Sequence, residues 1–197
     1  MRLLSSLWQA CKGQVKFFTV VLLGYLLQAC VMPYLKVGGV TPNLLLAVIA
    51  IVTVGYGRLR ALWVGAIYGI LTETMRPTLT LLNLALYPVS AAFMSMFFAD
   101  KSEKRLEYER SLGKAGRNVN PYLRTLGCAA MNVLLYEIVN VFYMYLSGAE
   151  LSMTMLYDSL TDMLATVALT AVIMLPVRRF LGFKRLQREP ARPHAHP

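Results

Sequence analysis

Residues 122–146, YLRTLGCAAMNVLLYEIVNVFYMYL, and residues 153–177, MTMLYDSLTDMLATVALTAVIMLPV, form two long apolar stretches separated by a short turn. A helix rises about 1.5 Å per residue, so about 20 apolar residues cross the roughly 30 Å hydrocarbon core of a bilayer. Both stretches exceed that length. We therefore predict a helical hairpin that crosses a membrane twice.

Four more apolar stretches precede this hairpin, at residues 17–34, 42–56, 61–75 and 79–98. The first and last are long enough to cross a bilayer, whereas the middle two have only about 15 residues each. These two are either short helices shielded by the bundle or a re-entrant pair. The sequence Gly55-Tyr56-Gly57 between them, followed by basic residues, favours a tight cytoplasmic turn between two spans. We therefore predict an all-α, polytopic membrane protein with six transmembrane helices within residues 17–177.

The basic residues are strongly biased to one side of these six spans. The chain has 20 Lys and Arg and a formal net charge of +10. With a cytoplasmic N-terminus, every basic residue except Lys36 and Arg76 lies in a cytoplasmic segment. The positive-inside rule describes this asymmetry, so we predict that both chain ends are cytoplasmic. The charge then reflects topology and attraction to anionic lipids at the cytoplasmic face, and no nucleic-acid partner is needed to explain it.

Three segments outside the predicted spans differ from them in composition, and each predicts a different structure. Residues 1–16 place apolar side chains on one helical face, which predicts a cytoplasmic interfacial helix. Residues 99–120 are highly charged, and we expect the fourth helix to project through them into the cytoplasm before a loop. Residues 178–197 form a basic tail, disordered from about Gln187. Residues 26–30, LLQAC, look like a lipoprotein cleavage box, but the long basic segment before them favours an uncleaved span.

The residues that usually carry catalysis are absent from the predicted spans. Both histidines, His194 and His196, lie in the tail, and the three cysteines have no metal-binding spacing. There is no nucleotide-binding loop and no hydrolase motif. We therefore expect a non-enzymatic protein without a cofactor or a metal site.

The predicted hairpin carries polar side chains within its apolar stretches. Ionisable groups in a span are costly, so each is a candidate functional residue. At about 100° per residue, the polar residues of each stretch share one helical face. The candidate intramembrane polar groove comprises Asn132, Tyr136, Glu137, Asn140, Asp158 and Asp162. It either binds a ligand, a proton or a partner helix, or supplies interhelical hydrogen bonds, and the second use is the commoner one.

A second candidate region lies in the two short stretches. Pro42 suits the first turn of a helix, with Thr41 as a possible cap, and Asn43 follows it. Gly65 and Gly69 form a small-xxx-small motif that packs helices closely, either within this bundle or against a partner helix. Glu73 is one turn further along and is close enough to Arg76 for a local ion pair. We group Pro42, Asn43, Gly65, Gly69 and Glu73 as candidate helix-packing or partner-binding residues.

The order of motifs over residues 28–87 resembles the MreD family of bacterial rod shape-determining membrane proteins. The matching features are Gln28 and Pro33, Pro42-Asn43-Leu44-Leu45-Leu46, Gly55 and Gly57, the Gly-rich stretch from Gly65 to Glu73, and Asn83-Leu84-Ala85-Leu86-Tyr87. Asn43 and Glu73 stand where the family usually has aspartate.

This resemblance implies a non-enzymatic scaffold of the cell-elongation machinery in the bacterial inner membrane. Its implied partners are an MreC-like bitopic protein and the cell-wall synthase, which consists of a glycosyltransferase and a penicillin-binding transpeptidase. The family's fold is similar to the substrate-binding component of energy-coupling-factor vitamin transporters. The alternative function is therefore that of such a transporter subunit.

Overall fold

The computed structural model describes residues 2–75, 81–99, 108, 111–112, 120–148 and 152–183. Its helices are α1 (Arg2–Cys30), the short 3₁₀ helix η1 (Met32–Tyr34), α2 (Leu44–Tyr56), α3 (Arg58–Met75), α4 (Leu82–Phe98), α6 (Pro121–Leu146) and α7 (Met153–Leu181). Within these residues, the only β-type pairing is one isolated bridge between Val37 and Val40. The predicted all-α class is confirmed.

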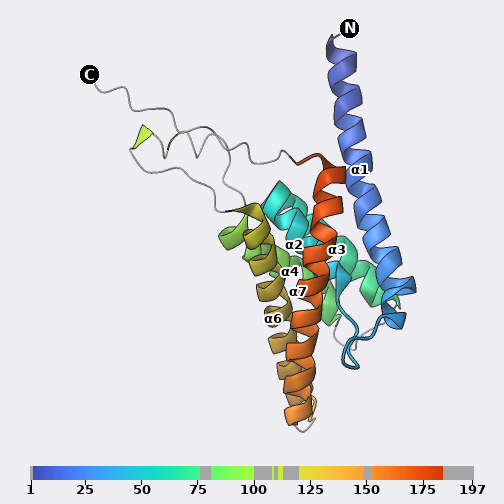
Figure 1. Cartoon of the computed structure of the whole chain (residues 1–197), viewed down its shortest axis with the longest axis vertical. Helices are drawn as coiled ribbons and strands as arrows, with labels where there is room; N and C mark the ends of the chain where they lie inside the picture. The colour runs from blue at the N-terminus through green and yellow to red at the C-terminus, as the bar shows by residue number, and fades with distance from the viewer. Residues whose placement is uncertain are drawn as a thin grey trace.

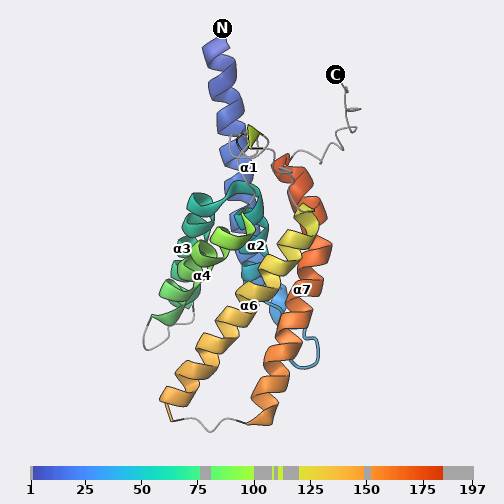
Figure 2. The same cartoon turned by 90° about the vertical axis from the view of Figure 1, so that its left-hand side faces the viewer.

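Three helical segments are long and apolar enough to cross a membrane: Cys11–Tyr34, Pro121–Leu146 and Met153–Leu181. The helices α2 and α4 are apolar but shorter. Successive helices alternate in direction, so that α1, α3 and α6 run one way along the long axis and α2, α4 and α7 run back (Figures 1 and 2). The protein is therefore a helical bundle with the length and composition of a membrane protein.

Basic side chains gather at one end of this bundle. Arg58 and Arg60 lie in the first turn of α3, Arg124 lies in the first turn of α6, and Arg178 lies in the last turn of α7. Because α3 and α6 begin where α7 ends, these four residues share one end, toward which the start of α1 also points (Figure 2). Lys36, in the loop after η1, lies at the opposite end. We call the end with the four arginines the basic end, and the opposite end the distal end.

The centre of the bundle is α2, a helix of 13 residues. All eleven residues from Leu44 to Val54 are buried, and the helix packs against α1, α3, α4, α6 and α7. A helix that is apolar on every side needs protein or lipid around it, and here the other five helices provide that environment. At about 1.5 Å per residue, α2 is only about 20 Å long, so it is a short helix shielded by the bundle.

Glycines set the close contact between α3 and α4. A Cβ atom on Gly65 would lie 2.7 Å from the Tyr87 carbonyl oxygen and 2.8 Å from the Pro88 Cα. A Cβ on Gly69 would lie 2.8 Å from the Asn83 carbonyl oxygen. The two glycines of the small-xxx-small motif therefore face the backbone of α4, and this face of α3 is occupied within the bundle.

The structure changes four predicted boundaries. The helix α1 runs without interruption from Arg2 to Cys30, so residues 1–16 do not form a separate interfacial helix. The start of α2 is capped by Asn43 rather than by Thr41, because the Asn43 side chain accepts a hydrogen bond from the Leu46 amide. Residues 178–183 are not part of a tail, since α7 continues to Leu181 and Phe183 packs against Gly55.

The fourth boundary is the end of α4. The helix stops at Phe98, and the next residue, Ala99, is extended. The Arg124 guanidinium donates a hydrogen bond to the Ala99 carbonyl, and the Phe98 ring lies against Gly127. These contacts with α6 hold the chain where it leaves the helix, so α4 does not project directly into the charged segment. Most of residues 99–120 lie outside the described residues.

Candidate functional site

A polar cavity of about 540 Å³ lies among the distal ends of the helices. It is lined by side chains from α1, η1, α2, α3, α4, α6 and α7 and from the loop before α2. The lining residues are Tyr25, Gln28, Ala29, Pro33, Thr41, Asn43, Leu45, Thr72, Met75, Asn83, Tyr87, Tyr136 and Asp162. Nine of these thirteen side chains carry hydrogen-bonding groups, which is an unusual composition for the interior of an apolar bundle.

The start of α2 faces this cavity, and three amide groups there donate hydrogen bonds to side chains. The Asn43 amide donates to the Thr166 hydroxyl at 2.9 Å, and the Leu44 amide donates to the Gln28 side-chain oxygen at 2.6 Å. The Leu46 amide donates to the Asn43 side-chain oxygen at 3.2 Å. The first amides of a helix have no partner within the helix. Here α7 and α1 supply the partners of the Asn43 and Leu44 amides, which ties both helices to the centre of the bundle.

Two asparagine–tyrosine pairs form part of the cavity wall. The Asn43 side-chain amide donates to the Tyr87 hydroxyl at 3.2 Å, and the Tyr136 hydroxyl donates to the Asn83 side-chain oxygen at 3.0 Å. The two tyrosine rings lie side by side, with centroids 5.5 Å apart. These bonds join α2 to α4 and α4 to α6 at one depth in the bundle.

Asp162 is the one carboxylate among the described residues that line the cavity. Its side chain is only 7% exposed, and one of its oxygens accepts a hydrogen bond from the Thr166 hydroxyl at 3.2 Å. Because Thr166 also accepts the bond from the Asn43 amide, the three residues form a chain from the carboxylate to the start of α2. This arrangement fixes the position of the carboxylate at the cavity wall.

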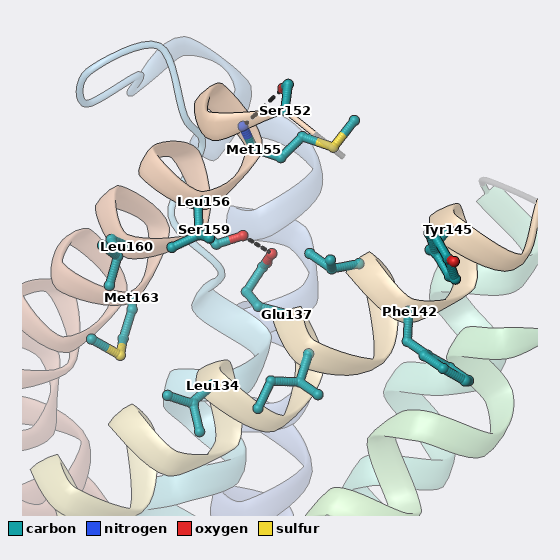
Figure 3. Close-up of a pocket in the computed structure, with 12 residues that line it drawn as sticks. Leu134, Glu137, Phe142, Tyr145, Ser152, Met155, Leu156, Ser159, Leu160 and Met163 are labelled. Atoms are coloured by element: carbon teal, nitrogen blue, oxygen red, sulfur yellow. Dashed lines mark hydrogen bonds between the residues drawn. The ribbon is translucent and has the colours of Figure 1, made fainter. Parts of the chain in front are cut away.

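A second hollow, an apolar groove of about 550 Å³, lies between α6 and α7 where the two helices diverge toward the distal end (Figure 2). It is lined by Leu134, Glu137, Ile138, Val141, Phe142 and Tyr145 of α6, and by Ser152, Met155, Leu156, Ser159, Leu160 and Met163 near and along the first half of α7. Glu137 and Ser159 point toward one another across it, and the Ser159 hydroxyl donates to the Glu137 carboxylate at 2.8 Å (Figure 3). The groove is thus apolar apart from one polar pair.

The structure separates the residues that the sequence groups into one polar groove. Tyr136 and Asp162 line the polar cavity, whereas Glu137 lines the apolar groove. The other three line neither: Asn132 is fully buried and bonds to the Cys128 sulfur, Asn140 is half-buried, and Asp158 is exposed. The predicted groove is thus divided between two hollows, because neighbouring residues on α6 point about 100° apart. Part of the predicted cluster still meets, since Asp162 interacts with Glu137 and Tyr136 with Asn140.

The second predicted group also divides. Asn43 lines the cavity, Pro42 is buried just before it, and Gly65 and Gly69 pack against α4. Glu73 is 6% exposed and lies near the distal end of α3. The expected pair between Glu73 and Arg76 involves a residue outside the described part of the chain.

Sequence reasoning missed Gln28, Asn83 and Tyr87 as site residues. Each is a hydrogen-bonding side chain within or at the end of an apolar stretch, and that was the available signal. The cavity gathers them because α1, α2 and α4 bring their distal ends together around it. Which polar residues meet depends on helix packing, which the sequence pattern of each helix does not specify.

We expect the substitution Asn43→Ala to lower the free energy of unfolding by about 2 kcal/mol. It removes the cap of α2, worth about 1 kcal/mol, and the bond to the Tyr87 hydroxyl, worth about the same. Asn43→Asp is the matched control, because aspartate also caps helices and its carboxylate accepts a bond from Tyr87. Thermal unfolding in detergent measures the difference, and equal losses from both variants would contradict this role of Asn43.

Comparison with protein-family models, with curated proteins and with solved structures finds no match to this chain in any of the three.

Proposed function

We propose that this chain is a non-enzymatic membrane scaffold of the bacterial cell-elongation machinery, and that it binds an MreC-like bitopic protein together with the cell-wall synthase. The observation that carries the proposal is the apolar groove between α6 and α7. The motif order over residues 28–87 supplies the link to this particular machinery.

The groove is long enough to contact about three turns of a transmembrane helix. Its α6 wall runs from Leu134 to Tyr145 and its α7 wall from Ser152 to Met163. Each wall is therefore about 16 Å long, roughly half of a bilayer core. Both walls belong to helices that are apolar enough to lie in a membrane, so the occupant is apolar as well.

The polar pair in the groove favours a protein helix over a lipid chain. Glu137 is a carboxyl group within a candidate span, and such groups generally face protein or water rather than lipid. The Ser159 hydroxyl satisfies one acceptor position of the carboxylate. A partner helix with a hydrogen-bond donor at this depth would satisfy another, whereas an acyl chain offers no donor.

The full proposal places six spans in the inner membrane, with both chain ends in the cytoplasm. The alternating helix directions and the basic end described above support it (Figures 1 and 2). In this orientation the cavity and the groove both lie in the outer half of the membrane. The short helix α2 crosses only as the shielded centre of the bundle.

A larger side chain in the groove is expected to weaken binding of the partner. Leu160 lies on the groove wall and is 49% exposed, so Leu160→Trp places an indole ring where the partner helix would pack. Val172→Trp is the matched control, since Val172 is on the same helix, is 71% exposed and lies outside the groove. We expect recovery of the MreC-like protein with an epitope-tagged chain to fall at least about tenfold for Leu160→Trp, the equivalent of about 1.4 kcal/mol, and to stay unchanged for Val172→Trp.

The measurement is affinity purification from native membranes in a mild detergent, followed by quantitative mass spectrometry. Equal recovery with both variants would place the partner on another face. If the unaltered chain is purified without any single-span protein, the scaffold proposal fails.

A second candidate function, that of a substrate-binding subunit of an energy-coupling-factor-type transporter, is favoured by the polar cavity. A transporter subunit needs a ligand site among its helices, and a cavity of this size lined by polar groups fits that requirement. The same purification separates the two candidates, because an ATP-driven module would be recovered in place of the single-span protein.

A further inference from the structure

We propose that the polar cavity binds a small aromatic amine or a related organic cation, and that it discriminates against anions. This inference rests on neither function proposed above, because the cavity is formed by the packing of the chain itself.

The start of α2 would ordinarily attract an anion, since unpaired amides and the helix dipole favour negative charge there. In this cavity, however, the amides of Asn43, Leu44 and Leu46 already donate to side chains of the chain itself. In addition, none of the lining residues that the structure describes is a lysine, arginine or histidine. An anionic ligand would therefore lose its hydration without gaining a positive partner among these groups.

The lining instead offers partners for a cation. Asp162 places a carboxylate at the wall, held by its bond with Thr166. Tyr87 and Tyr136 bring two aromatic rings within 5.5 Å of each other on the same wall. Ammonium groups are attracted both to carboxylates and to the faces of aromatic rings, and the attraction increases where water is excluded.

The volume and the remaining side chains set the size and shape of the ligand. A volume of about 540 Å³ is within the usual range for sites that enclose small organic molecules, about 300–1,000 Å³. Leu45, Met75 and Pro33 supply apolar surface beside the polar groups. A molecule with one flat apolar ring and one amino group matches this combination.

Three probes of equal size test the charge preference directly. Tyramine, tyrosol and 4-hydroxyphenylacetate share one phenol ring and carry an ammonium, a hydroxyl and a carboxylate, respectively. Binding to the full chain in lipid nanodiscs is measured by isothermal calorimetry at pH 7. We expect tyramine to bind at least about tenfold more tightly than 4-hydroxyphenylacetate, with tyrosol between them.

The variant Asp162→Asn then tests the source of the preference. It should weaken tyramine binding at least about tenfold and leave tyrosol binding nearly unchanged, because only the ammonium pairs with the carboxylate. Asp158→Asn is the control, since Asp158 lies on the same helix and is exposed outside the cavity.

The inference is overturned if 4-hydroxyphenylacetate binds as tightly as tyramine, if none of the three probes binds, or if Asp162→Asn folds and binds tyramine normally. Should Asp162→Asn fail to fold, the comparison of the three probes on the unaltered chain still decides the matter. If the purification recovers no single-span partner, the binding results for the three probes are unaffected. The two proposals are therefore tested independently.

Discussion

Replacing Gly65 with leucine is expected to prevent α3 and α4 from packing and to leave little folded protein. Even a single Cβ at this position would lie 2.7 Å from the Tyr87 carbonyl oxygen and 2.8 Å from the Pro88 Cα. Both are backbone atoms, so no side-chain rotation relieves the contact and the two helices have to separate. We expect a loss of at least about 3 kcal/mol, the upper part of the usual cost of overpacking.

The matched control for this substitution is Gly13→Leu. A Cβ on Gly13 meets nothing within 4 Å, and leucine favours helix formation over glycine by almost 1 kcal/mol. The control should therefore fold as well as the unaltered chain. Thermal unfolding and the yield of monodisperse protein in detergent measure both variants. A well-folded Gly65→Leu variant would mean that α3 and α4 are further apart than described here.

The substitution Tyr68→Ala is expected to cost about 3–5 kcal/mol, as is typical when a large buried aromatic side chain is removed from a core. Tyr68 of α3 is fully buried, and its hydroxyl donates to the Val21 carbonyl of α1 at 3.0 Å. Gly24 makes room for the tip of this side chain, since a Cβ there would lie 2.6 Å from the Tyr68 hydroxyl. The side chain thus connects α3 to α1, and its loss leaves a cavity between them.

Tyr68→Phe separates the contribution of packing from that of the hydrogen bond. It keeps the ring and removes only the bond to Val21, so we expect a loss of about 1 kcal/mol. Denaturant titration followed by tryptophan fluorescence provides the two free energies of unfolding. If Tyr68→Ala cost no more than Tyr68→Phe, the ring would not be a core residue, and the placement of α1 against α3 would be wrong.

These contacts also bear on where a partner can bind. The small-xxx-small motif of α3 is the sequence feature most often associated with docking of a second helix. In this chain its glycines face the backbone of α4, so a partner would have to displace α4 to reach them. The groove between α6 and α7 meets no such obstacle. We therefore place the partner-binding surface of the proposed scaffold in this groove, because binding there displaces no helix of the bundle.

The basic end of the bundle also contributes to packing. The Arg60 guanidinium lies over the Tyr56 ring at 4.3 Å, and the Arg178 guanidinium lies over the Phe183 ring at 5.1 Å. Tyr56 and Phe183 are themselves in contact, with ring centroids 4.8 Å apart. The contact between these two rings thus joins the turn between α2 and α3 to the end of α7, and a cation–π contact flanks it on each side. This explains why the chain stays packed beyond residue 178, where the basic composition alone predicted a tail.

The sequence by itself determined the class of the protein and the positions of its helices. Apolar stretches long enough for a bilayer identify α1, α6 and α7, and the end of α2 at Tyr56 and of α6 at Leu146 agree with the predicted ranges. These features are local, because the length of an apolar run and the charge of a loop do not depend on distant residues. The motif from Gly65 to Gly69 likewise predicted a close contact with another helix, although it did not identify which helix.

Only the tertiary structure decided which polar residues meet. Tyr136 and Glu137 are adjacent in sequence, yet one lines the polar cavity and the other the apolar groove. The cavity wall also brings Gln28 of α1 and Asp162 of α7 beside Asn43, although they are far apart along the chain. The physical reason is that each helix specifies only its own faces. The rotation and tilt of a helix within the bundle follow from contacts such as Gly65 with α4 and Tyr68 with α1.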